Sequence, residues 1–474
     1  MHAQAGFRLP RICLPQPRID LEKWAVIACD QHTSEPEYWR SVEREVGDAP
    51  SSLHLIFPEV HLGSADAAAR IGRIQDTMRS YLAQGVLVEH EGAIYVERTV
   101  GRRVRRGLML ELDLEHYDFS SESTSLIRPT EGTIVARLAP RIEVRNGAEL
   151  EVPHILVLID DPACTVIEPV GAARDTLTRL YETDLMLGGG HVAGYAVGAH
   201  DAERVAQALR ALASPQAFAA RYGVPEQTPV MLFAVGDGNH SLATAQSIWR
   251  RIRGSVDMNH PSRYALVEVV NIHDPALDFS PIHRLLFGVS VDVRQALTES
   301  FGAALSCTDV PTAAAMRARV QAATGSRPAA GLVGPGARFS VIEFAGPQDS
   351  LPVGLLQAFV DGLIEGGGAA DVDYVHGDDV LERLATTDSR VGLHFAPVAR
   401  AICCAGSCAT APCRARPSRW AKRTRSVTTS RRGGSARRLP RRSNTRARTT
   451  RPRAPPGWFP APATGVWSRC HPVR

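Results

Sequence analysis

The stretch Met231-Leu-Phe-Ala-Val-Gly-Asp-Gly-Asn-His240, followed by Ser241-Leu-Ala-Thr-Ala245, decides the fold expected for this chain. The apolar run from Val230 to Val235 predicts a buried strand, and Gly236-Asp237-Gly238 predicts a turn. Residues 242–252 then carry apolar side chains at spacings of three and four, which predicts an amphipathic helix. A strand, a glycine turn and a helix in succession are typical of α/β proteins.

The turn places Asp237, Asn239 and His240 at the N-terminus of the predicted helix. Free backbone N–H groups and the positive end of the helix dipole favour an anion such as phosphate there. The carboxylate of Asp237 suits Mg²⁺ or a proton. The alternative is purely structural, because Asp-Gly-Asn is common turn chemistry and Asn239 or Ser241 can simply cap the helix.

An earlier acidic group falls at the end of another predicted strand. Residues 21–30 become apolar towards Asp30, and His32 follows in a polar loop before a helix predicted from Glu35 to Val46. Strand ends often carry the sites of α/β proteins, so Asp30 and His32 are candidate site residues. An Asx turn at Asp30 is the structural alternative.

Two further segments carry charged groups. Arg128 is a possible anion clamp and Glu131 a possible metal or proton partner, but a solvated ion pair is the simpler interpretation and the one the sequence favours. His283 and Arg284 follow a second buried segment and are expected to face the same pocket, where arginine suits a phosphate or a carboxylate.

The chain has 474 residues, enough for two domains with well-buried cores. Residues 1–286 are expected to form the main domain, and residues 287–400, where helices alternate with short strands, a smaller one. The expected fold is mixed α/β (α+β), with mixed sheets, flanking helices and two packed subdomains. Neither a signal peptide nor a membrane-spanning apolar run is evident, so we expect a cytoplasmic protein.

The charge of the chain divides sharply at about residue 400. Residues 401–474 hold 18 of the 54 basic residues and none of the 50 acidic ones, which leaves a balance of −14 on residues 1–400. An acidic body argues against nucleic acid as its partner. The tail has no helical or strand period, so we expect it to be disordered.

A frameshift explains the tail better than a basic binding segment does. Read from the third base of each codon, residues 401–423 permit a continuation that contains Leu-Pro-Arg-Lys-Thr-Phe-Ser-Met-Gly-Glu. The single codon of Trp420 constrains the Met-Gly pair in that reading. Sequencing the gene around codon 400 tests this hypothesis, and a confirmed, unshifted frame would remove it.

Several long motifs resemble one family, the bacterial domain of unknown function 1015 family, over residues 8 to about 400. The matching segments are Glu22-Lys-Trp-Ala-Val-Ile-Ala-Cys-Asp-Gln31, Thr33-Ser-Glu-Pro-Glu-Tyr-Trp39, Thr130-Glu-Gly-Thr133, Pro153-His154 through Asp160-Asp161-Pro162, Gly236-Asp-Gly-Asn-His-Ser-Leu-Ala-Thr-Ala245, Asn271-Ile-His-Asp274 and Val375-His-Gly377. The family's usual ending is similar to the shifted reading of the tail.

The resemblance also points towards one activity. The Asp-Gly-Asn-His signature is similar to a segment of the ParB-like free serine kinases, which transfer phosphate to the hydroxyl of L-serine. Ser241 stands where those kinases carry arginine, and similarity between short motifs does not by itself establish function.

The function expected from these observations is transfer of phosphate to a small hydroxyl compound, with Mg²⁺ and ATP or ADP as cofactors. The alternative is a noncatalytic regulator that binds a nucleotide or metabolite in the same pocket. The residues expected to be catalytic are Asp237, His240 and Asp30, with Asp237 also as the metal ligand. The residues expected to bind the ligand are Gly236, Gly238, Asn239, His32, Arg128, Glu131, His283 and Arg284. The sequence leaves the substrate and the oligomeric state open.

Overall fold

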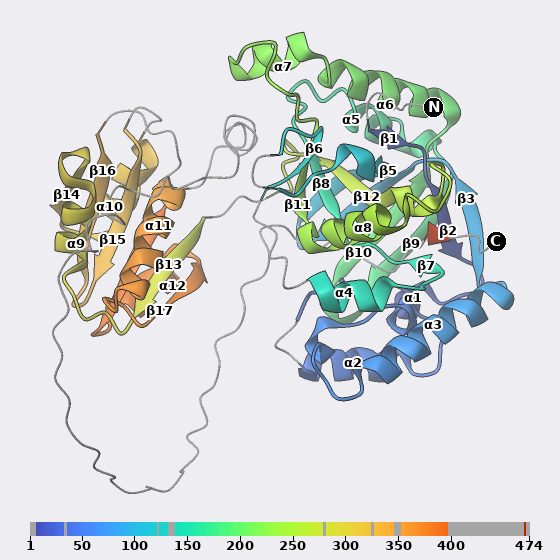
Figure 1. Ribbon diagram of the computed structural model, residues 1–474, viewed down its shortest axis with the longest axis horizontal. Helices are drawn as coiled ribbons and strands as arrows, with labels where there is room; N and C mark the ends of the chain where they lie inside the picture. Colours follow the sequence, from blue (N-terminus) through green and yellow to red (C-terminus); the bar gives the residue numbers. More distant parts are fainter. Residues whose placement is uncertain are drawn as a thin grey trace, which may run out of the picture.

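The structure is a computed structural model that describes residues 6–32, 36–120, 123–130, 138–277, 281–323, 327–345, 352–396 and 469–470. It is a mixed α/β structure with two large sheets (Figure 1). The predicted fold class is therefore confirmed.

The larger sheet has nine strands in the order β6-β11-β8-β12-β5-β4-β10-β9, with β1 also pairing with β5. It is mixed, because β11 runs parallel to β6 and β12 parallel to β8, whereas β11 and β8 are antiparallel. The strands of this sheet are β1 (Phe7–Arg8), β4 (Ile94–Val100), β5 (Arg103–Asp113), β6 (Ile127–Pro129), β8 (Leu156–Ile159), β9 (Arg179–Leu185), β10 (Gly190–Ala196), β11 (Phe233–Asp237) and β12 (Tyr264–Asn271).

Helices and short two-stranded ribbons surround this sheet. The ribbons pair β2 (Arg11–Pro15) with β3 (Leu87–Glu91), and β7 (Leu150–Glu151) with β19 (Arg469–Cys470). The helices are α1 (Leu21–Trp24), α2 (Pro36–Val46), α3 (Ala67–Ala83), α4 (Leu138–Arg145), α5 (Glu168–Ala172), α6 (Ala199–Leu212), α7 (Pro215–Tyr222) and α8 (Asn239–Ile252).

The centre of the larger sheet is buried on both faces. Every residue of β12 is buried, and seven consecutive residues of β5 are buried as well. One face packs against α6 and α8 in a cluster that includes Leu110, Leu209 and Trp249. Because successive side chains of a strand point to opposite faces, Met109 and Leu266 belong to a separate cluster on the other face.

The smaller sheet is antiparallel throughout and has six strands in the order β14-β16-β15-β18-β13-β17. Its strands are β13 (Ile282–Phe287), β14 (Leu305–Val310), β15 (Ala329–Gly334), β16 (Arg338–Phe344), β17 (Asp371–His376) and β18 (Arg390–Phe395). The helices α9 (Val293–Phe301) and α11 (Pro352–Glu365) share one core cluster with it, and α10 (Ala313–Ala322) and α12 (Asp378–Ala385) share another.

The two sheets divide between β12 and β13. The predicted boundary after residue 286 therefore falls inside β13, whose residues pair with β17 and β18 of the smaller sheet. No core cluster of the described residues combines side chains from both sides of residue 281.

One local expectation was wrong. Residues 21–30 do not form a strand, because Leu21–Trp24 is the helix α1. The carboxylate of Asp20 accepts hydrogen bonds from the backbone N–H groups of Glu22 and Lys23 and so caps this helix. Asp30 consequently lies in a turn after α1 and not at the end of a strand.

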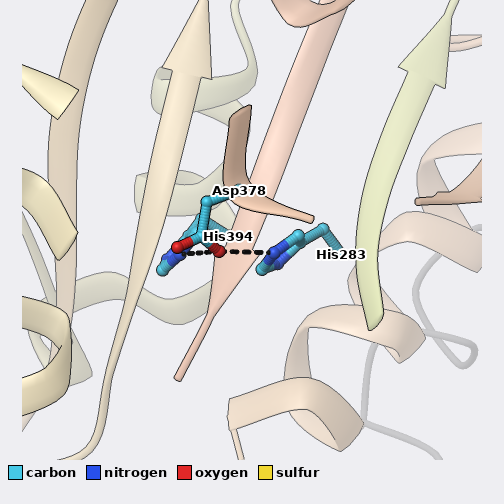
Figure 2. A group of neighbouring side chains, drawn as sticks. All are labelled: His283, Asp378 and His394. Atoms are coloured by element: carbon cyan, nitrogen blue, oxygen red, sulfur yellow. Dashed lines mark hydrogen bonds and ion pairs between the residues drawn. The ribbon is translucent and has the colours of Figure 1, made fainter. Parts of the chain in front are cut away.

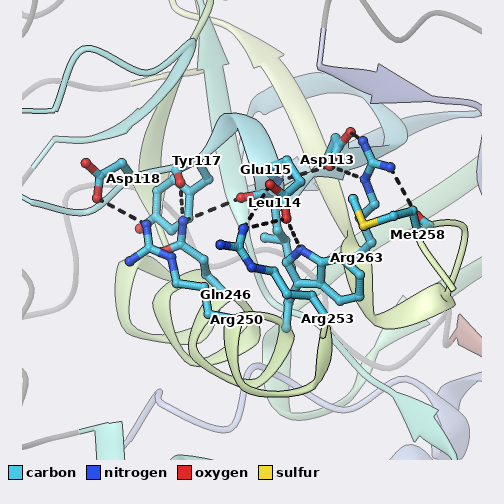
Figure 3. A network of polar contacts seen from close by, with 11 residues as sticks. Asp113, Leu114, Glu115, Tyr117, Asp118, Gln246, Arg250, Arg253, Met258 and Arg263 are labelled. Carbon is cyan, nitrogen blue, oxygen red and sulfur yellow. Dashed lines mark hydrogen bonds and ion pairs between the residues drawn. The ribbon is translucent and has the colours of Figure 1, made fainter. Parts of the chain in front are cut away.

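The helix α8 is fixed along its C-terminal half by polar contacts with the segment after β5 (Figure 3). The indole N–H of Trp249 donates to Glu115 at 2.5 Å, and the guanidinium of Arg253 pairs with the same carboxylate at 3.1 Å. The side-chain amide of Gln246 donates to the carbonyl of Tyr117. These contacts add to the buried apolar face of α8, so the position of its N-terminus is well determined.

The predicted tail lies outside the described residues, except for β19. Cys13 is disulfide-bonded. The free cysteines among the described residues are Cys29, Cys164 and Cys307. Among the described residues, no helix is both long enough and apolar enough to cross a lipid bilayer.

A buried ion pair joins β5 to β12 and yields a stability prediction. Arg105 and Glu268 are 2% and 1% exposed, and their side chains form two hydrogen bonds, at 3.1 and 2.9 Å. Arg105→Ala would leave the carboxylate of Glu268 buried without this partner. We expect it to lower the free energy of unfolding by about 3–5 kcal/mol in urea denaturation.

The matched control is Arg179→Ala, which removes a pair with Glu182 whose arginine is 57% exposed. Exposed pairs contribute about 0–1 kcal/mol, so this variant should unfold close to the wild type. Equal losses in the two variants would contradict the importance assigned to the buried pair.

Candidate functional site

The turn between β11 and α8 packs directly against the residues that lead into β8. Gly238 has φ of 77° and ψ of 25°, a left-handed conformation that glycine adopts without strain. A Cβ at this position would lie 2.8 Å from the carbonyl oxygen of His154 and 3.0 Å from the Cα of Ile155. Only a residue without a side chain allows this approach, which explains the glycine of the motif in physical terms.

Gly238 is the N-cap of α8, and no side chain caps this helix. The backbone N–H of Gly238 instead donates to the carboxylate of Asp237 at 2.8 Å. The expectation that Asn239 or Ser241 caps the helix is therefore wrong. Without a capping side chain, the N–H groups of the first turn remain suited to an anionic ligand.

His154 lies between a carboxylate and a thiol. Its Nε2 is 3.2 Å from Oδ2 of Asp30, and its Nδ1 is 3.8 Å from Sγ of Cys29. His154 is buried, whereas Asp30 and Cys29 are partly exposed. Sequence reasoning did not assign a role to His154 or Cys29.

The charges of this group follow from burial and proximity. Burial opposes the charge on His154, but Asp30, and to a lesser degree Cys29, outweigh it and raise the pKa of His154 well above 6.5. Burial alone would raise the pKa of Asp30, yet the attraction of His154 outweighs it and the pKa of Asp30 is lowered from 3.8. Near neutral pH the two side chains therefore form an ion pair.

A cavity of about 800 Å³, including solvent at its opening, lies beside His154. Its lining residues all come from positions 29–244, and they combine apolar side chains with a few polar ones from α4 and α8. They are Cys29, Leu55, Ile56, Phe57, Glu59, Leu62, Ile74, Met78, Arg141, Val144, Arg145, Ala148, Leu150, Glu151, Val152, Pro153, His154, Ser241 and Thr244.

Two arginines of α4 line this cavity, each paired with a glutamate that also lines it. Arg141 pairs with Glu59, and Nε of Arg145 donates to Glu151 at 3.1 Å. Ser241, in the first turn of α8, and Thr244, in the second, line the same cavity. The cavity therefore offers positive groups, hydroxyl groups and a helix N-terminus around an apolar interior.

None of the predicted site residues that the structure describes is among the lining residues of this cavity. Asp30 reaches the cavity through His154, and Ser241, next to His240, lines it. Asp237 and His240 are partly exposed, but neither belongs to the cavity lining described above. The roles assigned to these residues remain predictions.

Other predicted ligand-binding residues have structural partners. The guanidinium of Arg128 donates to the carbonyl oxygens of Ser125 and Pro229, at 2.7 and 2.8 Å, so these hydrogen bonds join β6 to the segment before β11. His32 stacks on the ring of Tyr38, with ring centroids 3.7 Å apart. Glu131 lies outside the described residues.

Arg284 belongs to the smaller sheet and contacts residues of that unit. Its Nε donates to Oε1 of Gln357 at 2.6 Å, and its guanidinium lies 5.7 Å from the ring centroid of Phe395. The lining of the cavity includes neither Arg284 nor His283. The hollow expected to unite Asp30, Asp237, His240 and Arg284 is therefore not found among the described residues.

His283 forms a separate group with Asp378 and His394 (Figure 2). Nε2 of His283 and Nε2 of His394 lie 3.0 and 3.1 Å from Oδ1 of Asp378. These atoms are close enough to hold a metal ion, but Nδ1 of His283 accepts the backbone N–H of Phe395 at 3.2 Å. The proton of neutral His283 then lies on Nε2 and is donated to Asp378, which favours a hydrogen-bonded cluster over a set of metal ligands.

One signal in the sequence pointed towards the missed residues. Cys29 and Asp30 lie near the end of one of the segments that carry the family resemblance, and Pro153-His154 begins another. Nothing in the spacing of these segments shows that they meet, because Cys29 and His154 are 125 residues apart.

The profile of a family described as a protein of unknown function (DUF1015) matches residues 12–352. No curated protein matches the chain.

Among solved structures, a mutant of a free serine kinase in complex with AMP is 12% identical, covering 66% of this chain and 85% of that one, with a TM-score of 0.33. A second mutant in complex with ADP is 13% identical, covering 64% and 82%, with a TM-score of 0.31. A conserved hypothetical protein from Pyrococcus furiosus is 11% identical, covering 63% and 84%, with a TM-score of 0.27.

The pair of Asp30 and His154 gives the stability a defined pH dependence. A raised histidine pKa stabilises the fold below about 6.5, and this contribution is lost as pH rises through the folded pKa of His154. A lowered aspartate pKa stabilises the fold above about 3.8, and this contribution is lost as pH falls through the folded pKa of Asp30. Asp30→Asn should therefore destabilise the protein most between about pH 4 and 6.5.

Urea denaturation of the wild type and Asp30→Asn across pH 3–9 measures this difference. Asp175→Asn, which changes a carboxylate that is 89% exposed, serves as the control. A difference between wild type and Asp30→Asn that does not vary with pH would show that the two side chains do not form the ion pair.

Proposed function

We propose a function for this chain, which belongs to the protein family of unknown function DUF1015. The proposed activity is that of a small-molecule phosphotransferase, which uses a nucleotide and Mg²⁺ to phosphorylate a hydroxyl compound. The observation that carries the proposal is the meeting of two features at one cavity. The first turn of α8, which no side chain caps, lines it through Ser241, and the charged pair of Asp30 and His154 lies beside it.

The proposed phosphate site is the first turn of α8. Backbone N–H groups after Gly238 would donate to the phosphate oxygens, and the positive end of the helix dipole favours the negative charge. Arg141 and Arg145 line the same cavity, and their guanidinium groups can exchange a glutamate oxygen for a phosphate oxygen. The apolar part of the lining suits the base of a nucleotide.

The remaining roles follow from the charges of the side chains. Phosphoryl transfer depends mainly on alignment and on stabilisation of negative charge. Protonated His154 would stabilise charge on the transferred group, and ionised Asp30 would accept the proton of the substrate hydroxyl. Asp237, at the end of β11, is the residue that would hold Mg²⁺.

A thermal-shift assay with ATP and ADP, with and without Mg²⁺, tests the binding step. A nucleotide at about 100 times its Kd should stabilise the protein by about 2.7 kcal/mol and raise Tm. Asp237→Asn should reduce the additional shift that Mg²⁺ produces. If neither nucleotide changes Tm, the proposed function is wrong.

Turnover distinguishes a kinase from a noncatalytic regulator. With L-serine and other small hydroxyl compounds as acceptors, Asp30→Asn should lower kcat about 10²–10⁴-fold, because it removes the proposed general base. The nucleotide-dependent Tm shift of this variant should persist, and Asp175→Asn should retain full activity. Nucleotide binding without phosphorylation of any hydroxyl compound would favour the regulator.

A further inference from the structure

The cavity also holds a reactive group that the proposed phosphoryl transfer does not use, the thiol of Cys29, which lies next to His154 and Asp30. Sγ of Cys29 faces Nδ1 of His154 at 3.8 Å, while Nε2 of the same ring faces the carboxylate of Asp30 at 3.2 Å. Cys29 and His154 both line the cavity, and the thiol of Cys29 is free. A sulfur, an imidazole and a carboxylate therefore follow one another at the wall of a cavity.

This order matches the requirements of covalent catalysis by a thiol. A cysteine nucleophile needs a basic group within hydrogen-bonding reach, and that group needs a third residue that fixes its orientation. Here the carboxylate holds one ring nitrogen of His154, which turns the other nitrogen towards the sulfur. The imidazole can exchange a proton with the sulfur, and the thiolate is the nucleophilic form of a cysteine.

The first turn of α8 supplies a further element of such a site. Attack on an acyl group places negative charge on the carbonyl oxygen, and backbone N–H groups at a helix N-terminus stabilise that charge. Ser241 brings this turn to the cavity that Cys29 and His154 line, and no side chain caps it. The apolar lining, including Leu55, Phe57 and Met78, suits the hydrocarbon part of an acyl group.

We propose that Cys29 is a nucleophile that accepts an acyl group from an apolar ester or thioester bound in this cavity. His154 is its proton-transfer partner, and Asp30 is the residue that positions His154. This activity goes beyond the proposed phosphotransferase, because it depends on the sulfur of Cys29.

The reaction needs only Cys29, His154 and one water molecule besides the ester or thioester. The thiolate of Cys29 attacks the acyl carbon, so a sulfur–carbon bond forms and the bond from that carbon to the leaving oxygen or sulfur breaks. The proton on Nδ1 of His154 passes to the leaving atom. Water then attacks the acyl group as His154 takes its proton, and the sulfur–carbon bond breaks to release a carboxylic acid and the thiolate of Cys29, with His154 protonated again.

The other described free cysteines provide internal controls. Burial, together with the carboxylates of Glu168 and Asp161, raises the pKa of Cys164 although it is exposed. Burial also raises the pKa of Cys307. Cys164 is thus more accessible than Cys29, but its sulfur lies beside carboxylates, whereas that of Cys29 lies beside His154. Accessibility alone would make Cys164 the more reactive thiol, and the neighbouring groups would make Cys29 the more reactive one.

The full-length protein incubated with p-nitrophenyl butyrate tests the proposal. The expected result is a burst of about one equivalent of p-nitrophenol and a butyryl group on the peptide that contains Cys29, identified by mass spectrometry. Cys29→Ser should lose the burst, His154→Gln should slow it about 100-fold or more, and Cys164→Ser should behave as the wild type. A burst that persists in Cys29→Ser, or a butyryl group on another cysteine, would overturn the proposal.

A second measurement needs no turnover and guards against variants that fail to fold. Iodoacetamide at pH 6 should label Cys29 of the wild-type protein at least tenfold faster than Cys164, when each peptide is quantified separately. Faster labelling of Cys164 would overturn the proposal. The nucleotide-dependent Tm shift tests the phosphotransferase separately. If Cys29→Ser keeps this shift but loses the burst, the loss concerns the acyl transfer alone.

Discussion

The close approach of Gly238 to the backbone of His154 and Ile155 is the constraint on which the site depends. A Cβ at residue 238 would lie 2.8 Å from the carbonyl oxygen of His154, so these two backbone segments meet without an intervening side chain. The approach joins the start of α8 to the start of β8. It thereby places a helix N-terminus, a buried imidazole and the wall of a cavity next to one another.

The two ends of α8 make different contacts. Its C-terminal half is held by buried apolar packing and by the contacts of Gln246, Trp249 and Arg253 (Figure 3). Its N-terminal turn has no capping side chain and lines the cavity through Ser241. Because the helix is already held in place, its N-terminal N–H groups need little rearrangement to bind an anion. Pre-organised sites share this property.

The sequence was sufficient where local periodicity determines structure. The β11-turn-α8 unit agrees with prediction because its apolar spacings are regular. Residues 21–30 were misread because the cap at Asp20 turns Leu21–Trp24 into a helix. Asp30 was predicted as a candidate site residue, but its contact with His154 was not predicted, because a contact across 124 residues depends on tertiary packing. The position of Arg284 was not predictable for the same reason, since it depends on the pairing of β13 within the smaller sheet.

A crystal structure of the protein with ADP and Mg²⁺ tests the central claim most directly. The account predicts phosphate oxygens within hydrogen-bonding distance of backbone N–H groups in residues 239–241, with the ring of His154 beside them and the adenine among the apolar residues of the cavity. Binding of ADP at another place, with the first turn of α8 unoccupied and the cavity empty, would contradict the account.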